Sequence, residues 1–196
     1  MSAEAATPCS ESQVQCVEEV FQRIASDLSM IADRELALES IETSLMEQRP
    51  EGRDKIHISF RLGFQLGEDD ETHGCLLVPL PDAISLACAL MMVPPEVMQT
   101  SRTQETLDNT TKDAMLDVGN FVCSATDAAL RVLGVEDVKV VFEGCQGVRP
   151  DVRPAMVYQE GDPLVVGRAE AGLAELPKDT MILVLPARAL GASEAL

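Results

Sequence analysis

The segment KIHISFRLGFQL, residues 55–66, alternates apolar and polar side chains over its whole length. A β-strand places successive side chains on opposite faces, whereas a helix would scatter this pattern around its circumference. The segment therefore predicts a strand with one buried face. We expect His57, on the polar face, to meet solvent or an interface, and we expect the strand to be a sheet edge that can pair with a second copy.

Strands and helices are predicted on both sides of this segment. We predict a turn over the polar residues 67–74. The segment from about Val14 to Ile31 has the apolar spacing of an amphipathic helix. Further strands are predicted at 75–80, 135–143, 155–159, 168–176 and 181–187. Further helices are predicted at 82–92 and 110–133, and residues 35–46 are predicted to form a helical or mixed segment. Residues 96–109 and 144–154 are predicted to be connections. Because the strands come in hairpin-spaced pairs, the predicted fold class is α/β (α+β), a mainly antiparallel sheet packed with long helices.

The length of the chain favours one domain. At 196 residues a single hydrophobic core is the default. Residues 1–11 are small and polar, so we predict a disordered N-terminus there and a single domain over 12–196. The N-terminus has neither a basic nor an apolar stretch typical of a signal peptide, and no apolar run is long enough to span a bilayer. We expect a cytoplasmic protein with no membrane partner.

Charge and cysteine content narrow the classes of function. A formal net charge of −18 disfavours binding to nucleic acid, and the scarcity of aromatic residues disfavours base stacking. The six cysteines include no CxxC pair, and there are only two histidines. We therefore expect reduced thiols, with Cys88 and Cys123 as small buried hydrophobic groups, and no metal site or cofactor of the chain's own.

The predicted helix over 110–133 carries a narrow polar stripe. At about 100° per residue, a group of polar residues falls close together opposite an apolar face: Asp113, Asp117, Asn120, Ser124 and Arg131. Asp117 and Asn120 are i and i+3 neighbours, so a carboxylate and a carboxamide project side by side. Together they can anchor a cation and hold a water molecule against an electrophile. Such a stripe is also typical of a merely solvated helix face.

The stretch DAMLDVGNFVCSATDAAL, residues 113–130, resembles the signature helix of the CheC/CheX/FliY family of chemotaxis phosphatases. That signature has an acidic residue, two intervening positions and an Asn, which Asp117 and Asn120 match in order. The preceding segment GCLLVPLPDAISLACALMMVPPE, residues 74–96, resembles the strand and helix before the signature. The similarity covers about residues 50–188, and a single such motif indicates CheX as the nearer relative.

The resemblance implies a function. In that family the Asn orients the water that attacks the aspartyl phosphate of a CheY-like response-regulator receiver domain, and the acidic residue pairs with the receiver's lysine. Asn120 and Asp117 would take these roles, with Asp113, Phe121 and Ser124 contacting the partner. The phosphate, the aspartate and Mg²⁺ would come from the receiver. The resemblance also implies a homodimer.

Two departures from the family pattern favour an alternative. Asp117 replaces the usual Glu and is one methylene shorter, and Ser124 stands where Gly is common, adding a side chain where a partner would approach. A catalytically inactive adaptor that binds a receiver or a flagellar-switch component therefore stays open. So does a dimeric α/β domain in which the stripe is only solvated.

Overall fold

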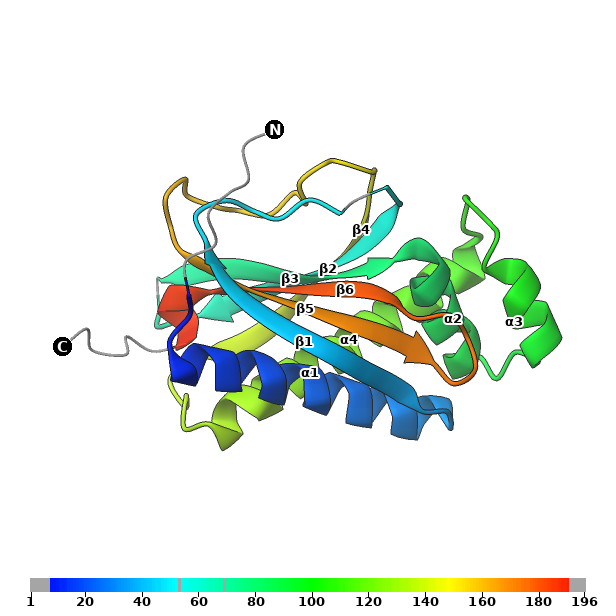
Figure 1. The fold of residues 1–196 in the computed structure, drawn as a ribbon, viewed down its shortest axis with the longest axis horizontal. Helices are drawn as coiled ribbons and strands as arrows, with labels where there is room; N and C mark the ends of the chain where they lie inside the picture. Colours follow the sequence, from blue (N-terminus) through cyan, green and yellow to red (C-terminus); the bar gives the residue numbers. More distant parts are fainter. Residues whose placement is uncertain (1–7, 53, 69, 191–196) are drawn as a thin grey trace.

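A computed structural model describes residues 8–52, 54–68 and 70–190. A six-stranded, fully antiparallel sheet with strand order β1-β5-β6-β3-β2-β4 forms its centre (Figure 1). The strands are β1 (Leu36–Met46), β2 (His57–Gln65), β3 (Glu71–Pro79), β4 (Lys139–Val148), β5 (Leu164–Leu173) and β6 (Asp179–Pro186). The helices are α1 (Glu11–Ala32), α2 (Leu80–Leu90), α3 (Pro95–Ser101), α4 (Asn109–Val132) and the short 3₁₀ helix η1 (Ala187–Leu190). The predicted fold class is confirmed.

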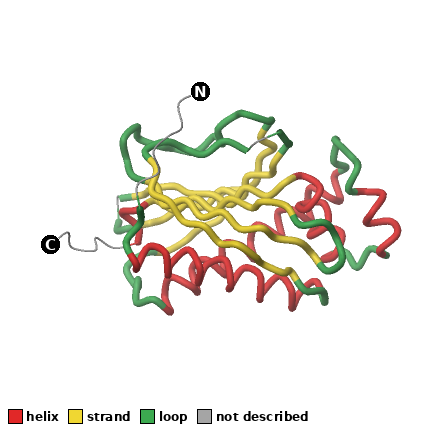
Figure 2. Tube along the Cα trace, viewed as in Figure 1, coloured by secondary structure: helices red, strands yellow, loops and turns green. Residues whose placement is uncertain are grey.

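Helices cover one face of the sheet. In Figure 2, α1 and α4 run beneath the strands, and α2 and α3 lie toward one end. The main core fills this interface: Phe60, Leu62 and Phe64 of β2 point toward the helices and are completely buried. Burying apolar side chains of this size is worth about 1.5–3 kcal/mol each relative to exposure.

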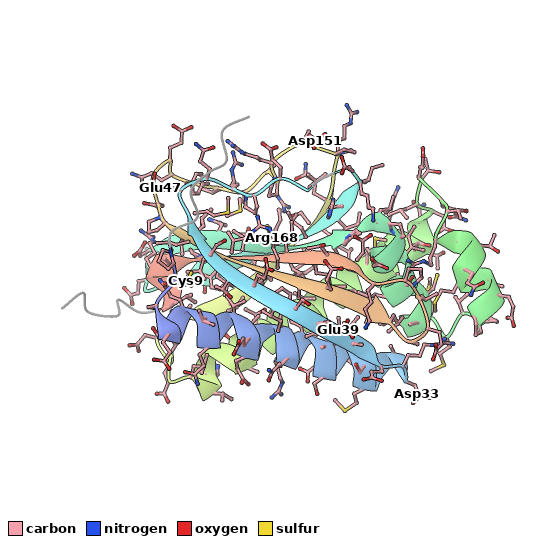
Figure 3. The ribbon with its side chains drawn as sticks, in the orientation of Figure 1. Cys9, Asp33, Glu39, Glu47, Asp151 and Arg168 are labelled. Atoms are coloured by element: carbon pink, nitrogen blue, oxygen red, sulfur yellow. The ribbon has the colours of Figure 1, made fainter. Side chains whose placement is uncertain are left out.

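Two loops cover the opposite face. Residues 47–52, 54–56 and 149–163 lie above the strands over a second, smaller cluster that includes Cys75 and Leu77 (Figure 1). Glu47 and Asp151, labelled in Figure 3, belong to these loops. Tyr158 connects the two loops. Its hydroxyl donates to the backbone carbonyl of Glu47, and Cζ of the Arg49 guanidinium lies 5.6 Å from the centroid of the Tyr158 ring.

This covering overturns the expectation for His57. Its side chain is buried, with 4% of the residue exposed, and Nδ1 lies 3.0 Å from the carbonyl oxygen of Lys55. Burial lowers the pKa of the imidazole, which the hydrogen bond with Lys55 offsets only in part. The expected sheet edge is also wrong, because β2 lies between β3 and β4 and the edge strands are β1 and β4.

Several local predictions differ from the structure. Residues 35–46 form edge strand β1 instead of a helical or mixed segment, and 155–159 lie in the covering loops instead of forming a strand. The connection 96–109 contains the short helix α3, and β4 continues to Val148 instead of ending at Glu143. The helix over 14–31 and the strand over 55–66 are confirmed as α1 and β2.

The start of α1 and all six cysteines lie within the described residues. Residues 1–7 of the predicted disordered N-terminus lie outside the described residues, and Ser10 caps α1 by accepting from the Gln13 N–H. All six cysteines are described and free of disulfides, with Cys88 and Cys123 buried as predicted. No helix in the described part of the chain combines the length and the apolar character that crossing a bilayer requires.

Candidate functional site

Helix α4 has well-defined ends. The Asp108 side chain accepts from the Thr111 N–H at 2.7 Å, and these backbone hydrogen bonds hold the pKa of the Asp108 carboxyl below its ordinary value. At the other end, Gly134 follows the helix in the left-handed conformation with φ +79°, and the Val135 N–H donates to the Leu130 carbonyl. The helix predicted over 110–133 is thus present within one residue at each end.

The polar stripe lies on the solvent side of α4. Asp113, Asp117, Asn120 and Ser124 are all exposed. The opposite face is buried against the rest of the fold, and its residues Met115, Val118, Val122, Ala125 and Ala129 are at most 1% exposed. The helix is therefore anchored along its apolar side while its polar side chains face outward together.

The side chains of Asp117 and Asn120 are available for a partner. Within the described ranges neither makes a hydrogen bond or an ion pair, whereas Arg131 pairs with Asp127 further along the same helix. As i and i+3 neighbours they project from adjacent turns of a rigid helix. An exposed carboxylate next to an exposed carboxamide can receive an ammonium group and a water molecule at once.

Ser124 and Phe121 occupy different environments. The Ser124 hydroxyl donates to the backbone carbonyl of Asn120 at 2.9 Å, so it is turned back onto its own helix. Phe121 is half-buried and packs against the core. The structure thus places Ser124, with Asp113, on the exposed stripe, whereas Phe121 lies at its margin.

Two contacts that were not predicted fix the position of α4. A Cβ atom added to Gly119 would lie 2.1 Å from Cζ of Phe142 in β4, so the helix packs closely against the strand at this point. Asp127 accepts from the Val140 N–H at 3.0 Å and from Arg131 at 2.8 Å. Burial alone would raise the pKa of Asp127, but these hydrogen bonds outweigh it and lower the pKa.

Leu116 is an exposed apolar residue beside the polar stripe that the sequence did not indicate. It is 42% exposed and stands one position before Asp117 and one turn before Asn120. Its place on the helix wheel, at the margin of the polar stripe, could have revealed it. An exposed leucine beside the carboxamide adds an apolar contact to an otherwise polar surface.

Comparison with solved structures identifies the fold. FliY from Thermotoga maritima superposes with a TM-score of 0.67 at 15% identity, covering 94% of each chain. The FliM middle domain from H. pylori gives 0.63 at 10% identity, covering 93% of this chain and 96% of FliM. CheX from Desulfovibrio desulfuricans gives 0.53 at 11% identity, covering 86% of this chain and 96% of CheX. No family model and no curated protein sequence matches the chain.

These neighbours match the family that the motif predicted. The fold is the one shared by CheC, CheX, FliY and the FliM middle domain, so the predicted resemblance is confirmed at the level of fold. The comparison does not confirm CheX as the nearer relative, since FliY and FliM superpose with higher scores.

Proposed function

We propose that this protein acts in chemotaxis signalling by hydrolysing the aspartyl phosphate of a CheY-like response-regulator receiver domain. The observation that carries the proposal is the exposure of Asp117 and Asn120, without partners in the described part of the chain, on a helix of the CheC/CheX/FliY fold. Helix α4 would dock at the receiver's phosphorylation site with its polar stripe facing the phosphoryl group.

Each side chain would have a distinct role. The Asn120 carboxamide would accept from and donate to one water molecule and hold it in line with the phosphoryl group. The water oxygen forms a bond to phosphorus as the bond between phosphorus and the aspartyl oxygen breaks, which releases inorganic phosphate and a free carboxylate. Asp117 would pair with the receiver's lysine and fix the helix in register.

The receiver would supply the remaining components. The phosphorylated aspartate and Mg²⁺ belong to the partner, so this chain contributes positioning instead of a nucleophile. The net charge of −18 favours approach of a lysine-bearing surface. Leu116 would pack against an apolar part of the same surface.

The direct experiment follows the decay of a phosphorylated CheY-like receiver with and without this protein. Faster decay that Asp117→Ala and Asn120→Ala both abolish supports the proposal. Unchanged decay in both variants contradicts it. Exposed substitutions of this kind usually change the free energy of unfolding by less than about 0.5 kcal/mol, so a loss of activity would report on the site itself.

A non-catalytic adaptor is the second candidate function. The likeness to FliM favours it, because one of the similar FliM structures is a complex with FliG. In this case the protein would bind a receiver or a flagellar-switch component through the same stripe. Binding without accelerated decay, lost in Asp117→Ala, would favour the adaptor over the phosphatase.

The predicted homodimer and cytoplasmic location stay proposals. Strands β1 and β4 each lack a second strand partner within the described residues, and a second copy would pair with one of these edges. Sedimentation equilibrium of the purified chain measures this directly: a monomer at micromolar concentration would contradict the dimer.

A further inference from the structure

Three side chains of metal-binding type converge on the sheet face opposite the helices. Glu71 and His73 come from β3, and Glu143 comes from β4. Nε2 of His73 lies 3.0 Å from Oε1 of Glu143, and one ligand atom from each of the three side chains lies within 4.8 Å of the others. His73 is largely enclosed, with 11% of its side chain exposed.

A glycine creates the space for this convergence. Strands β3 and β4 are not neighbours, because β2 pairs with both, so their backbones lie roughly 9.5 Å apart. Gly63 of β2 stands between His73 and Val141 in the register. A Cβ atom at Gly63 would lie 3.0 Å from Oε1 of Glu71 and 3.0 Å from Oε1 of Glu143. Because Gly63 has no side chain, a gap remains above it, and the carboxylates of Glu71 and Glu143 extend into this gap.

Two carboxylates in one gap favour a cation between them. Both carboxylates and the His73 imidazole present donor atoms to this gap, within 4.8 Å of one another. Two arginines lie nearby, but their hydrogen bonds go elsewhere. Arg61 donates to the backbone carbonyl of Glu143, and Arg188 binds the Asp70 carboxylate and the backbone carbonyl of Glu71.

We propose that Glu71, His73 and Glu143 bind a divalent transition-metal ion, with Zn²⁺ as the representative metal. One imidazole nitrogen and two carboxylate oxygens suit Zn²⁺, whereas Mg²⁺ and Ca²⁺ prefer oxygen ligands throughout. Metal–ligand bonds of about 2.0–2.2 Å require the ligand atoms to lie roughly 3–3.5 Å apart. The exposed Glu71 side chain can move to meet this requirement.

A hollow adjoins the proposed metal position. It has a volume of about 140 Å³, and its lining includes Glu71, His73, Tyr158, Asp162 and Arg188. Three protein ligands leave the fourth position of a tetrahedral zinc ion for a water molecule or a small anion, and this hollow can hold it. The site lies on the opposite side of the sheet from α4, so it is independent of the proposed phosphatase.

The test is calorimetric titration of Zn²⁺ into the full-length, reduced, chelator-treated protein. We expect one equivalent to bind, and we expect Glu71→Gln to weaken binding by at least about tenfold. Glu71 is exposed, so this variant removes a ligand without disturbing the core. The matched control is Glu68→Gln, an exposed residue of the adjacent turn, which should bind as the wild type does. His73→Gln should also weaken binding, provided that its circular dichroism spectrum is that of the wild type.

Cysteine binding must be distinguished from this site. The three convergent ligands are one imidazole and two carboxylates, and none of the six free cysteines is among them. Co²⁺ should therefore bind without a thiolate-to-metal charge-transfer band. The proposal is overturned if the wild type binds no Zn²⁺, if Glu71→Gln and a folded His73→Gln bind with unchanged affinity, or if Co²⁺ shows the thiolate band.

Discussion

Gly119 of α4 lies directly against the ring of Phe142 in β4. The space that a Cβ atom would occupy at Gly119 is only 2.1 Å from Cζ and 2.4 Å from Cε2 of that ring. Helix and strand can approach this closely because the glycine has no side chain. Asn120 is the next residue, so this contact sets how far the proposed water-positioning carboxamide projects from the sheet.

Replacing Gly119 with alanine should force α4 and β4 apart or displace the Phe142 ring. Such overpacking typically costs about 1–3 kcal/mol in the free energy of unfolding, and urea denaturation would measure it. The matched control is Gly147→Ala in the same strand, where an added Cβ has no atom within 4 Å. Equal stability of the two variants would contradict the close packing.

Removing the Ser124 hydroxyl should leave the proposed activity unchanged. This hydroxyl donates to the Asn120 backbone carbonyl, so its hydrogen is already engaged within the helix. Ser124→Ala should therefore bind and dephosphorylate a receiver as the wild type does, within about twofold, and surface plasmon resonance with the phosphorylation-decay assay would measure both. A large gain or loss would show that the hydroxyl contacts the partner.

Asp82 should make the stability of the protein depend on pH. Its carboxyl is buried and accepts a hydrogen bond from Arg102 at 2.9 Å. Burial raises the pKa of this carboxyl from 3.8 to about 6, and Arg102 offsets only part of the rise. Between these two values the folded state keeps a proton that the unfolded chain has lost. The stabilisation is complete below pH 4 and is lost as the pH rises through 6.

The variant Asp82→Asn removes this titration. The free energy of unfolding of the wild type minus that of Asp82→Asn should fall by about 2–3 kcal/mol between pH 4 and pH 7. Denaturation curves at intermediate pH values would give the midpoint. A difference that does not change with pH would show that Asp82 has an ordinary pKa in the folded protein.

His57 should have the opposite dependence. Its buried imidazole has a lowered pKa, so the folded state binds the proton less readily than the unfolded chain. Its contribution to stability is present above the unfolded pKa of 6.5 and is lost as the pH falls toward the folded value. The free energy of unfolding of the wild type minus that of His57→Gln should therefore decrease on acidification below pH 6.5. An increase would contradict the burial of a neutral imidazole.

The sequence predicted the elements whose periodicity is uninterrupted. The alternation over 55–66 became β2, and the apolar face of the helix over 110–133 became the buried side of α4. Because the helical period alone places Asp117 and Asn120 together, their exposure on one stripe was predictable.

Interrupted periodicity explains the errors. In β1 the apolar residues Leu36 and Leu38 are followed by Ile41 because the register shifts between Glu39 and Glu42, where Ser40 has φ +51°. This bulge breaks the alternation and gives the spacing of a helix. In β4, Gly144 has φ +94° and lies beside a similar shift in the register with β2. This irregularity explains why Gly144, a residue of β4, was predicted to lie in the connection over 144–154.

Contacts between distant segments could not be predicted from local patterns. The loops that bury His57 cover a sheet face whose alternating pattern indicated solvent. The convergence of Glu71, His73 and Glu143 depends on a strand order that places β2 between their strands, and on Gly63 in the middle. Their separation along the chain has no recognisable metal-binding spacing.

The most direct test of the proposed function measures phosphate release from a phosphorylated CheY-like receiver under single-turnover conditions, with the receiver saturated by wild-type protein or by Asn120→Ala. If Asn120 positions the attacking water, the wild type accelerates release, and the variant still binds the receiver but loses the acceleration by about a hundredfold or more. If the variant binds and accelerates release as the wild type does, Asn120 does not position the water and the proposed mechanism is wrong.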